Sequence, residues 1–251
     1  MTWHEPAQTW RSGAWSLELR DDELADIAFG GLVALRSIRA VVRDRDWDTA
    51  PLVVDEVAAD AGTLRLHVHT AGLGAELSGT LRVEASAVAL TVALELTAHR
   101  AFRTNRTGLV VLHPPVAAGA PLRVRHSDGS RETTRFPDRI SPHQPVLDIA
   151  GLAWQAGGLD VDVRFRGDVF EMEDQRNWTD ASFKTYSRPL ALPFPYELAA
   201  GSSVRQQIEV RVRTTGETTP RGRDAIELRA GGSFPQVAVG AATAPDPAPT
   251  L

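Results

Sequence analysis

The chain has 251 residues, of which 43% are apolar and 24% charged, which is the composition of a globular protein and not of a disordered or membrane protein. Its net charge of −5 argues against a broad basic surface for nucleic acid. The absence of cysteine excludes disulfides and cysteine-based redox, metal or nucleophilic chemistry.

The N-terminal segment shows neither the basic nor the apolar part of a signal peptide, and no run approaches the roughly 20 apolar residues that cross a bilayer. We therefore expect a cytoplasmic protein that contacts neither membrane nor nucleic acid. P-loop, Gly-x-Gly-x-x-Gly and Gly-x-Ser-x-Gly motifs are absent from the sequence, which disfavours nucleotide and nucleophilic-serine chemistry. We expect no cofactor.

Apolar and polar residues alternate along much of the chain, which predicts strands with one packed and one solvated face. In chain order these segments are 64–69, 81–84, 88–96, 108–113, 122–125, 161–166 and 208–213. The segments 88–96 and 108–113 are the most apolar and are predicted to be central strands. Glycine and aspartate turns separate the segments, which indicates an all-β antiparallel sandwich. We predict a single domain over residues 1–240 and a flexible Pro/Ala-rich tail over 241–251.

A polar segment continues the strand predicted at 169–173 and ends near Lys184, the only lysine of the chain. Extended backbone places Glu171 and Glu173 on one face with Cβ atoms roughly 6–7 Å apart, a separation suited to acid/base work on a sugar-sized substrate. We predict that these two carboxylates transfer protons and that Lys184 stabilises negative charge on a substrate oxygen. The alternative is a solvated turn in which Lys184 pairs with Asp180.

The rest of this segment carries the residue types that bind sugars. Trp178 is predicted to stack on a sugar ring, and Arg176 and Asn177 to orient hydroxyl groups. Asp174 and Asp180 complete the predicted substrate-binding residues of the segment.

Two histidines are candidates for the complementary acid. His113 ends an apolar strand, and His143 lies in a loop with three prolines. The alternatives are a histidine that bonds a neighbouring carbonyl and a rigid loop that only covers the fold. The charged segment 43–48 is predicted to be a turn in which Trp47 packs in the loop; the alternative is that Trp47 lines a pocket.

Arg103, Asn105 and Arg106 form a second candidate binding group, because two arginines beside an asparagine can clamp a carboxylate or hydroxyls. The alternative is a turn with Asn105 in a left-handed conformation. His67 and His69 share a strand face at a spacing that can bind a metal, but no third ligand lies near them in sequence. We predict an exposed sheet face there and no metal site.

The sequence EMEDQRNWTDASFKTY at 171–186 resembles the signature segment in the N-terminal domain of bacterial D-apionate lactonase-like proteins. Segments 35–39, 42–47 and 140–145 are similar as well, and the likeness spans most of residues 15–215. The resemblance implies a curved two-sheet β-sandwich related to the galactose mutarotase superfold. It also implies a role with sugar-acid lactones of branched plant sugars. Longer members of the family continue into a barrel domain, and we expect this chain to act without one.

We therefore expect a carbohydrate-active protein that handles a sugar or sugar-acid lactone by general acid/base chemistry, either lactone hydrolysis or a mutarotase- or epimerase-type interconversion. The alternatives are a non-catalytic carbohydrate-binding module or accessory subunit, and a structural protein in which the polar segment only closes the sandwich. The expected partner is a small carbohydrate or sugar-acid lactone. A homodimer or a separately encoded partner domain is also possible.

Overall fold

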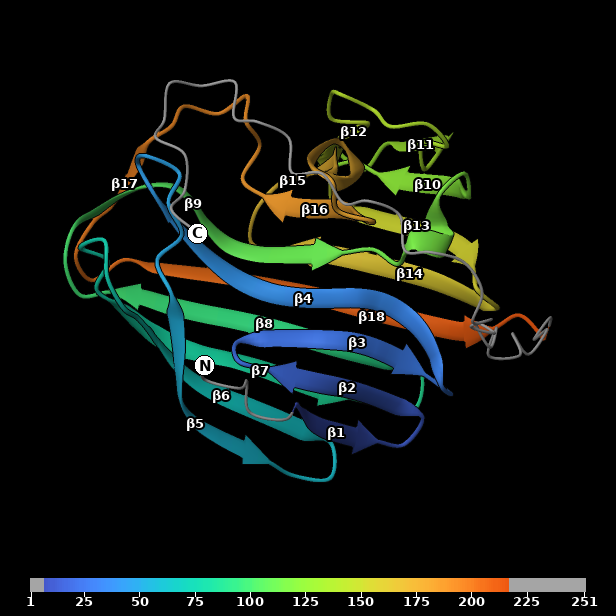
Figure 1. Cartoon of the computed structure of the whole chain (residues 1–251), viewed down its shortest axis with the longest axis horizontal. Coiled ribbons are helices and arrows are strands. Elements are labelled where there is room, and N and C mark those ends of the chain that lie inside the picture. Colours follow the sequence, from blue (N-terminus) through green and yellow to red (C-terminus); the bar gives the residue numbers. More distant parts are fainter. Residues whose placement is uncertain (1–6, 217–251) are drawn as a thin grey trace, which may run out of the picture. The chain divides into compact units, whose positions relative to one another are not determined.

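A computed structural model of the protein describes residues 7–216, so the tail predicted at 241–251 lies outside the described residues. The described residues form two nine-stranded sheets in which every strand pair is antiparallel. This arrangement confirms the all-β antiparallel sandwich. In Figure 1 the long strands β4 and β9 run side by side and curve along their length.

The first sheet, sheet A, contains the N-terminal strands and the strands of the polar segment. Its order is β1 (Gln8–Ser12), β2 (Trp15–Arg20), β3 (Glu23–Phe29), β4 (Leu32–Asp44), β9 (Phe102–Leu112), β16 (Phe183–Ser187), β15 (Phe170–Asp174) and β12 (Val146–Ile149), with β17 (Tyr196–Leu198) also paired to β9.

The second sheet, sheet B, contains most of the strands that the alternating pattern predicts. Its order is β11 (Arg131–Arg135), β10 (Pro121–Arg125), β13 (Gly151–Ala156), β14 (Leu159–Arg166), β18 (Ser203–Thr214), β8 (Ala89–Ala98), β7 (Leu77–Ala85), β6 (Thr63–Thr70) and β5 (Leu52–Ala59). Two short 3₁₀ helices are also present, η1 (Pro115–Ala117) and η2 (Gln175–Trp178). The strands predicted from alternation all form, and residues 108–112 of the segment predicted at 108–113 are the C-terminal part of β9.

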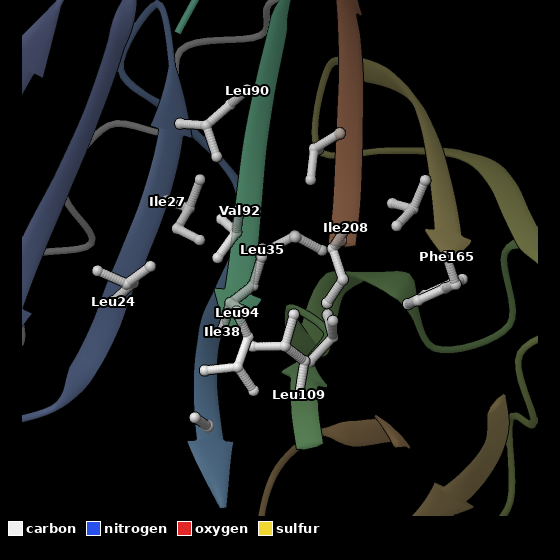
Figure 2. Close-up of a cluster of buried hydrophobic side chains, with 14 of the residues drawn as sticks. Leu24, Ile27, Leu35, Ile38, Leu90, Val92, Leu94, Leu109, Phe165 and Ile208 are labelled. Carbon is white, nitrogen blue, oxygen red and sulfur yellow. The ribbon is translucent and has the colours of Figure 1, made fainter. Parts of the chain in front are cut away.

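The core lies between the two sheets, because each sheet buries the apolar side chains of one face. Figure 2 shows side chains from both sheets that meet there: Leu24, Ile27, Leu35, Ile38 and Leu109 from sheet A, and Leu90, Val92, Leu94, Phe165 and Ile208 from sheet B. Since the inner faces are closed by this packing, any site for a polar ligand in the described residues has to lie on an outer face or at an edge.

One polar bridge crosses the core next to strand β16. The buried side chain of Gln206 in β18 accepts a hydrogen bond from the Leu109 amide at 2.7 Å and donates to Ser187 Oγ at 2.9 Å. Gly108 makes room for this bridge, because a Cβ there would lie 2.4 Å from Ser187 Oγ and 2.5 Å from the Gln206 amide. The bridge ties sheet B to β9 and β16 of sheet A, which both carry polar residues of the site described below.

Candidate functional site

The candidate site is built on the outer face of sheet A, where β15 and β16 pair. The register places Glu173 opposite Lys184 and Glu171 opposite Tyr186. Side chains alternate between the faces of a strand, so these four residues share the outer face. The intervening residues point into the core: Phe170, Met172 and Phe183. The predicted common face of Glu171 and Glu173 is therefore confirmed.

A pocket of about 600 Å³ opens on this face. Its lining combines aromatic rings, three cations, one carboxylate and an amide, a mixture that suits a polar ring-shaped ligand. The lining residues come from β4, β9, β15, β16, η2 and two loops: Arg43, Trp47, Arg106, Glu173, Gln175, Trp178, Lys184, Tyr186 and Leu190.

Lys184 and Glu173 form an ion pair in this pocket, with Lys184 Nζ 2.7 Å from Glu173 Oε2. The other carboxylate oxygen accepts a hydrogen bond from Trp178 Nε1 at 2.8 Å. Burial lowers the pKa of Lys184, and Glu173 opposes that shift. The partner of the lysine is thus Glu173 and not Asp180, and the pair lines a pocket instead of a solvated turn.

Glu171 has a different environment from Glu173, although the two share a face. It is 2% exposed, and its Oε1 accepts hydrogen bonds from the Tyr186 hydroxyl at 2.6 Å and the Leu190 amide at 2.9 Å. Burial raises the pKa of Tyr186, and Glu171 adds to that rise. Glu173 lines the pocket and Glu171 does not, so the two carboxylates predicted to work as a pair lie in different environments.

Asp174 and Arg176 hold a loop beside the pocket. The Asp174 carboxylate accepts hydrogen bonds from Arg176 Nη2 at 2.8 Å and from the Ser141 amide at 2.9 Å. Arg176 also donates to the carbonyls of residues 137–139. Burial acts to raise the pKa of Asp174, but these hydrogen bonds hold it below its usual range. Both residues are fully engaged within the protein, so the structure favours a positioning role over substrate binding.

The other predicted binding residues of the polar segment are dispersed around η2. Trp178 ends this helix and is 67% exposed at the pocket. Asn177 is exposed but is not among the lining residues. Asp180 forms an ion pair with Arg36 of β4, and the same guanidinium donates to Ser182 Oγ at 3.0 Å. Of these three residues only Trp178 lies in the pocket.

Neither histidine lines the pocket. His113 is fully buried between the rings of Phe136 and Trp154, at centroid distances of 5.3 and 5.2 Å, and its Nε2 lies 2.7 Å from Thr185 Oγ1. Burial lowers the pKa of His113 to about 3. His143 is exposed in the loop that Asp174 and Arg176 hold. The structure thus places the two candidate acids apart from the Glu173–Lys184 pair.

The arginine–asparagine group lies within β9 and is not a turn. Arg103 is exposed, and Asn105 is buried with its Nδ2 donating to the Arg45 carbonyl at 2.9 Å. Arg106 alone reaches the pocket, where its guanidinium stacks 3.6 Å from the centre of the Tyr186 ring.

Several pocket residues were not among the predicted site residues, and the most important are Arg43 and Trp47, of which only Trp47 had a pocket position as its alternative. Trp47 packs edge-on against Phe194 at 5.3 Å, as a loop tryptophan would, yet it also lines the pocket. Arg43 Nη1 donates to the Trp47 carbonyl at 2.8 Å. Tyr186, Gln175 and Leu190 were not predicted as site residues either. The charged segment 43–48 was the available signal, because it places a tryptophan beside two arginines.

Within residues 7–216, no group of three or more His, Asp or Glu side chains is placed to hold a metal ion. In the same part of the chain, the helices are too short to cross a bilayer.

Sequence comparison relates this chain to a known family. A family model described as D-apionate lactonase, N-terminal domain, matches residues 2–215. A curated protein of Brucella anthropi, described as D-apionate lactonase, is 38% identical over 223 residues, which are 82% of this chain and 35% of that protein. The chain therefore spans about a third of the length of this curated relative.

Structural comparison agrees on the fold. A galactose mutarotase-like protein from Lactobacillus casei has a TM-score of 0.61 at 10% identity, with 83% of this chain and all of that chain covered. A GH36 α-galactosidase from Geobacillus stearothermophilus has a TM-score of 0.53 at 11% identity, with 83% of this chain and 41% of that chain covered. At such identities the likeness shows the fold alone, and the fold is the galactose mutarotase-like sandwich.

Proposed function

This chain belongs to the D-apionate lactonase N-terminal domain family, and we propose on that premise that its pocket on sheet A binds a sugar or sugar-acid lactone and acts on it by general acid/base chemistry. The observation that carries this proposal is the Glu173–Lys184 ion pair, which lines a pocket beside the exposed ring of Trp178. A charged acid and base beside an aromatic platform are what proton transfer on a sugar ring requires.

Each pocket residue has a distinct proposed role. Trp178 stacks on the apolar face of the sugar ring. Glu173 accepts a proton, either from the water that adds to a lactone carbonyl or from the anomeric hydroxyl of an aldose. Lys184 stabilises the oxyanion and returns a proton to the ring oxygen as the ring C–O bond breaks. Lactone hydrolysis and ring opening of an aldose use the same two proton transfers.

Burial of Lys184 supports this assignment. Because burial lowers its pKa, the ammonium gives up a proton more readily than an exposed lysine does. Glu171 takes no part in the proposed step, since it is buried and does not line the pocket. The predicted pair Glu171/Glu173 is thus replaced by Glu173 and Lys184.

Binding without catalysis is the second candidate function. Both oxygens of Glu173 already accept hydrogen bonds or ion pairs within the protein, from Lys184 and Trp178. The curated relative also extends far beyond the part that this chain matches. A sugar-binding module that serves a separate catalytic domain would need the same pocket but no turnover.

Turnover assays of the full chain separate these functions. The substrates are D-apionolactone, other aldonolactones and aldoses, followed by NMR, with Glu173→Gln and Lys184→Met as site variants. Glu95→Gln, in the exposed Glu95–Arg205 pair of sheet B, is the matched control. We expect turnover to fall at least about 100-fold in both site variants and to stay unchanged in the control.

Thermal unfolding of every variant shows whether the fold is retained. Sugar binding without turnover in the wild type would assign the module function. Turnover that survives both site variants would contradict the proposed site.

A further inference from the structure

The charges of the pocket do not balance. Among the lining residues, Arg43, Arg106 and Lys184 carry positive charge, and Glu173 carries the one negative charge. Glu173 is paired with Lys184. The buried carboxylate of Glu171 lies outside the lining and attracts Arg106 without forming an ion pair with it, so both arginines remain without a directly contacting carboxylate. Within residues 7–216, neither Arg43 nor Arg106 forms a salt bridge with a carboxylate.

Arg106 is the more unusual of the two, because it is only 6% exposed. Its guanidinium lies 3.6 Å from the centre of the Tyr186 ring and 5.3 Å from that of Trp47. Its Nε is buried without a hydrogen-bond partner among the described residues. Arginines this deeply buried are normally paired, since an unpaired buried charge is strongly unfavourable.

Arg43 adds a second cation at the same place. It lies directly opposite Arg106 in the antiparallel pairing of β4 with β9. Like charges opposite each other in a sheet destabilise it unless an anion lies between them. Arg43 and Arg106 both act to lower the pKa of Lys184, so all three cations share one electrostatic environment.

We propose that Arg106 and Arg43 form an anion subsite that takes the carboxylate of an open-chain sugar acid, whose hydroxyls reach Glu173, Lys184 and Trp178. This inference rests on the proposed function and names its ligand class. A planar guanidinium can donate two parallel hydrogen bonds to one carboxylate. The carboxylate of the ligand would thus provide the negative charge that pairs with the two arginines.

The subsite predicts a preference among related ligands. A sugar acid carries the matching charge, whereas its lactone and the corresponding polyol are neutral. Sugar acids should therefore bind more tightly than neutral compounds of the same carbon skeleton. Added salt should weaken binding of the acid and leave binding of the polyol unchanged.

Calorimetric titration of the full chain tests this preference with D-apionate and D-gluconate as carboxylate probes. D-Glucitol is the neutral match for gluconate, and D-glucose 6-phosphate tests a phosphate in place of the carboxylate. We expect at least one carboxylate probe to bind at least about tenfold more tightly than glucitol. Arg43→Gln should remove most of that preference, and Arg205→Gln on sheet B should leave it intact.

Arg106→Gln is the stronger variant, but its burial means that it can fail to fold, in which case Arg43→Gln decides. If a neutral sugar or lactone binds in a Glu173-dependent way as tightly as the acids do, the anion subsite is overturned and the proposed function stands. Tight binding of glucose 6-phosphate alone also overturns the carboxylate assignment. Failure of every probe, lactones included, overturns both proposals.

Discussion

The outer faces of the two sheets are both rich in charge, yet they differ in how the charges are placed. On sheet B, Arg205 pairs with Glu95 at 2.6 Å and Arg211 with Glu209 at 2.7 Å, and the side chains of the first pair are 70% and 50% exposed. On sheet A, Glu171 and Arg106 are almost fully buried. A depression of about 570 Å³ also exists on sheet B, but the Arg205–Glu95 pair occupies part of its lining.

Both faces carry many charged residues, so the number of charges does not distinguish the candidate site. The burial of charged side chains does. Exposed pairs such as those on sheet B contribute little to stability and need no ligand. Buried charged groups need a specific partner. On sheet A, Glu171 of β15 has the Tyr186 hydroxyl of β16, whereas Arg106 has no salt bridge with a carboxylate among the described residues. Matched substitutions on the two faces should therefore differ strongly in their effects on stability and binding.

The largest effect is expected for buried His113, with exposed His143 as its counterpart. It concerns the pH dependence of the free energy of unfolding. The pKa of His113 is lowered by burial to about 3, against 6.5 in the unfolded chain. Between about pH 3 and pH 6.5 the imidazole is therefore protonated in the unfolded state and neutral in the folded state. The contribution of His113 to the free energy of unfolding is present above pH 6.5 and is lost as the pH falls toward the folded pKa. The loss approaches about 1.4 kcal/mol per pH unit and sums to about 3 kcal/mol between pH 6.5 and 4.

Urea unfolding between pH 7 and 4 measures this loss. His113→Gln should remove that part of the pH slope, whereas the exposed His143→Gln should follow the wild type. An unchanged slope in His113→Gln would show that the buried ring is not the group responsible.

The next effect compares a buried and an exposed glutamate directly. Glu171→Ala leaves the Tyr186 hydroxyl and the Leu190 amide without their acceptor, so we expect a loss of about 2–3 kcal/mol in the free energy of unfolding. Glu95→Ala on sheet B should change that free energy by less than about 0.5 kcal/mol. Chemical denaturation measures both, and equal losses would break the comparison.

The smallest effect concerns the aromatic edge of the pocket. Trp178→Ala should weaken binding of a sugar ligand by about 1–2 kcal/mol, because the stacking surface is lost. Trp178→Phe keeps a ring but loses the hydrogen bond to Glu173, so it separates stacking from the bond. Titration calorimetry supplies the affinities. Unchanged affinity in Trp178→Ala would remove this residue from the site.

The fold was largely predictable because sheet B buries one face of each strand and so keeps the two-residue period. The strands of the N-terminal part were harder, since bulges interrupt the pairing of β2 with β3 and of β3 with β4 and shift the alternation. Strand β5 is mostly exposed and has little apolar pattern to detect.

The site was only partly predictable. Like-charged Glu171 and Glu173 on one face cannot neutralise each other, unlike Glu209 and Arg211 of β18, so their partners had to come from elsewhere. The pairing of β15 with β16 supplies Lys184 and Tyr186, which lie in the same sequence segment. Arg43 and Trp47 come from a region about 130 residues away in sequence, and only the strand order β4–β9–β16 brings them to the pocket.

A thermal-shift screen shows whether the pocket on sheet A is the carbohydrate site. The purified chain is screened against sugars, aldonates and aldonolactones, as wild type, as Lys184→Met and as Arg205→Met on sheet B. A ligand at 100 times its dissociation constant should stabilise the wild type by about 2.7 kcal/mol. We predict that this shift disappears in Lys184→Met and persists in Arg205→Met. A shift that persists in Lys184→Met, or the absence of any shift in the wild type, would contradict the account.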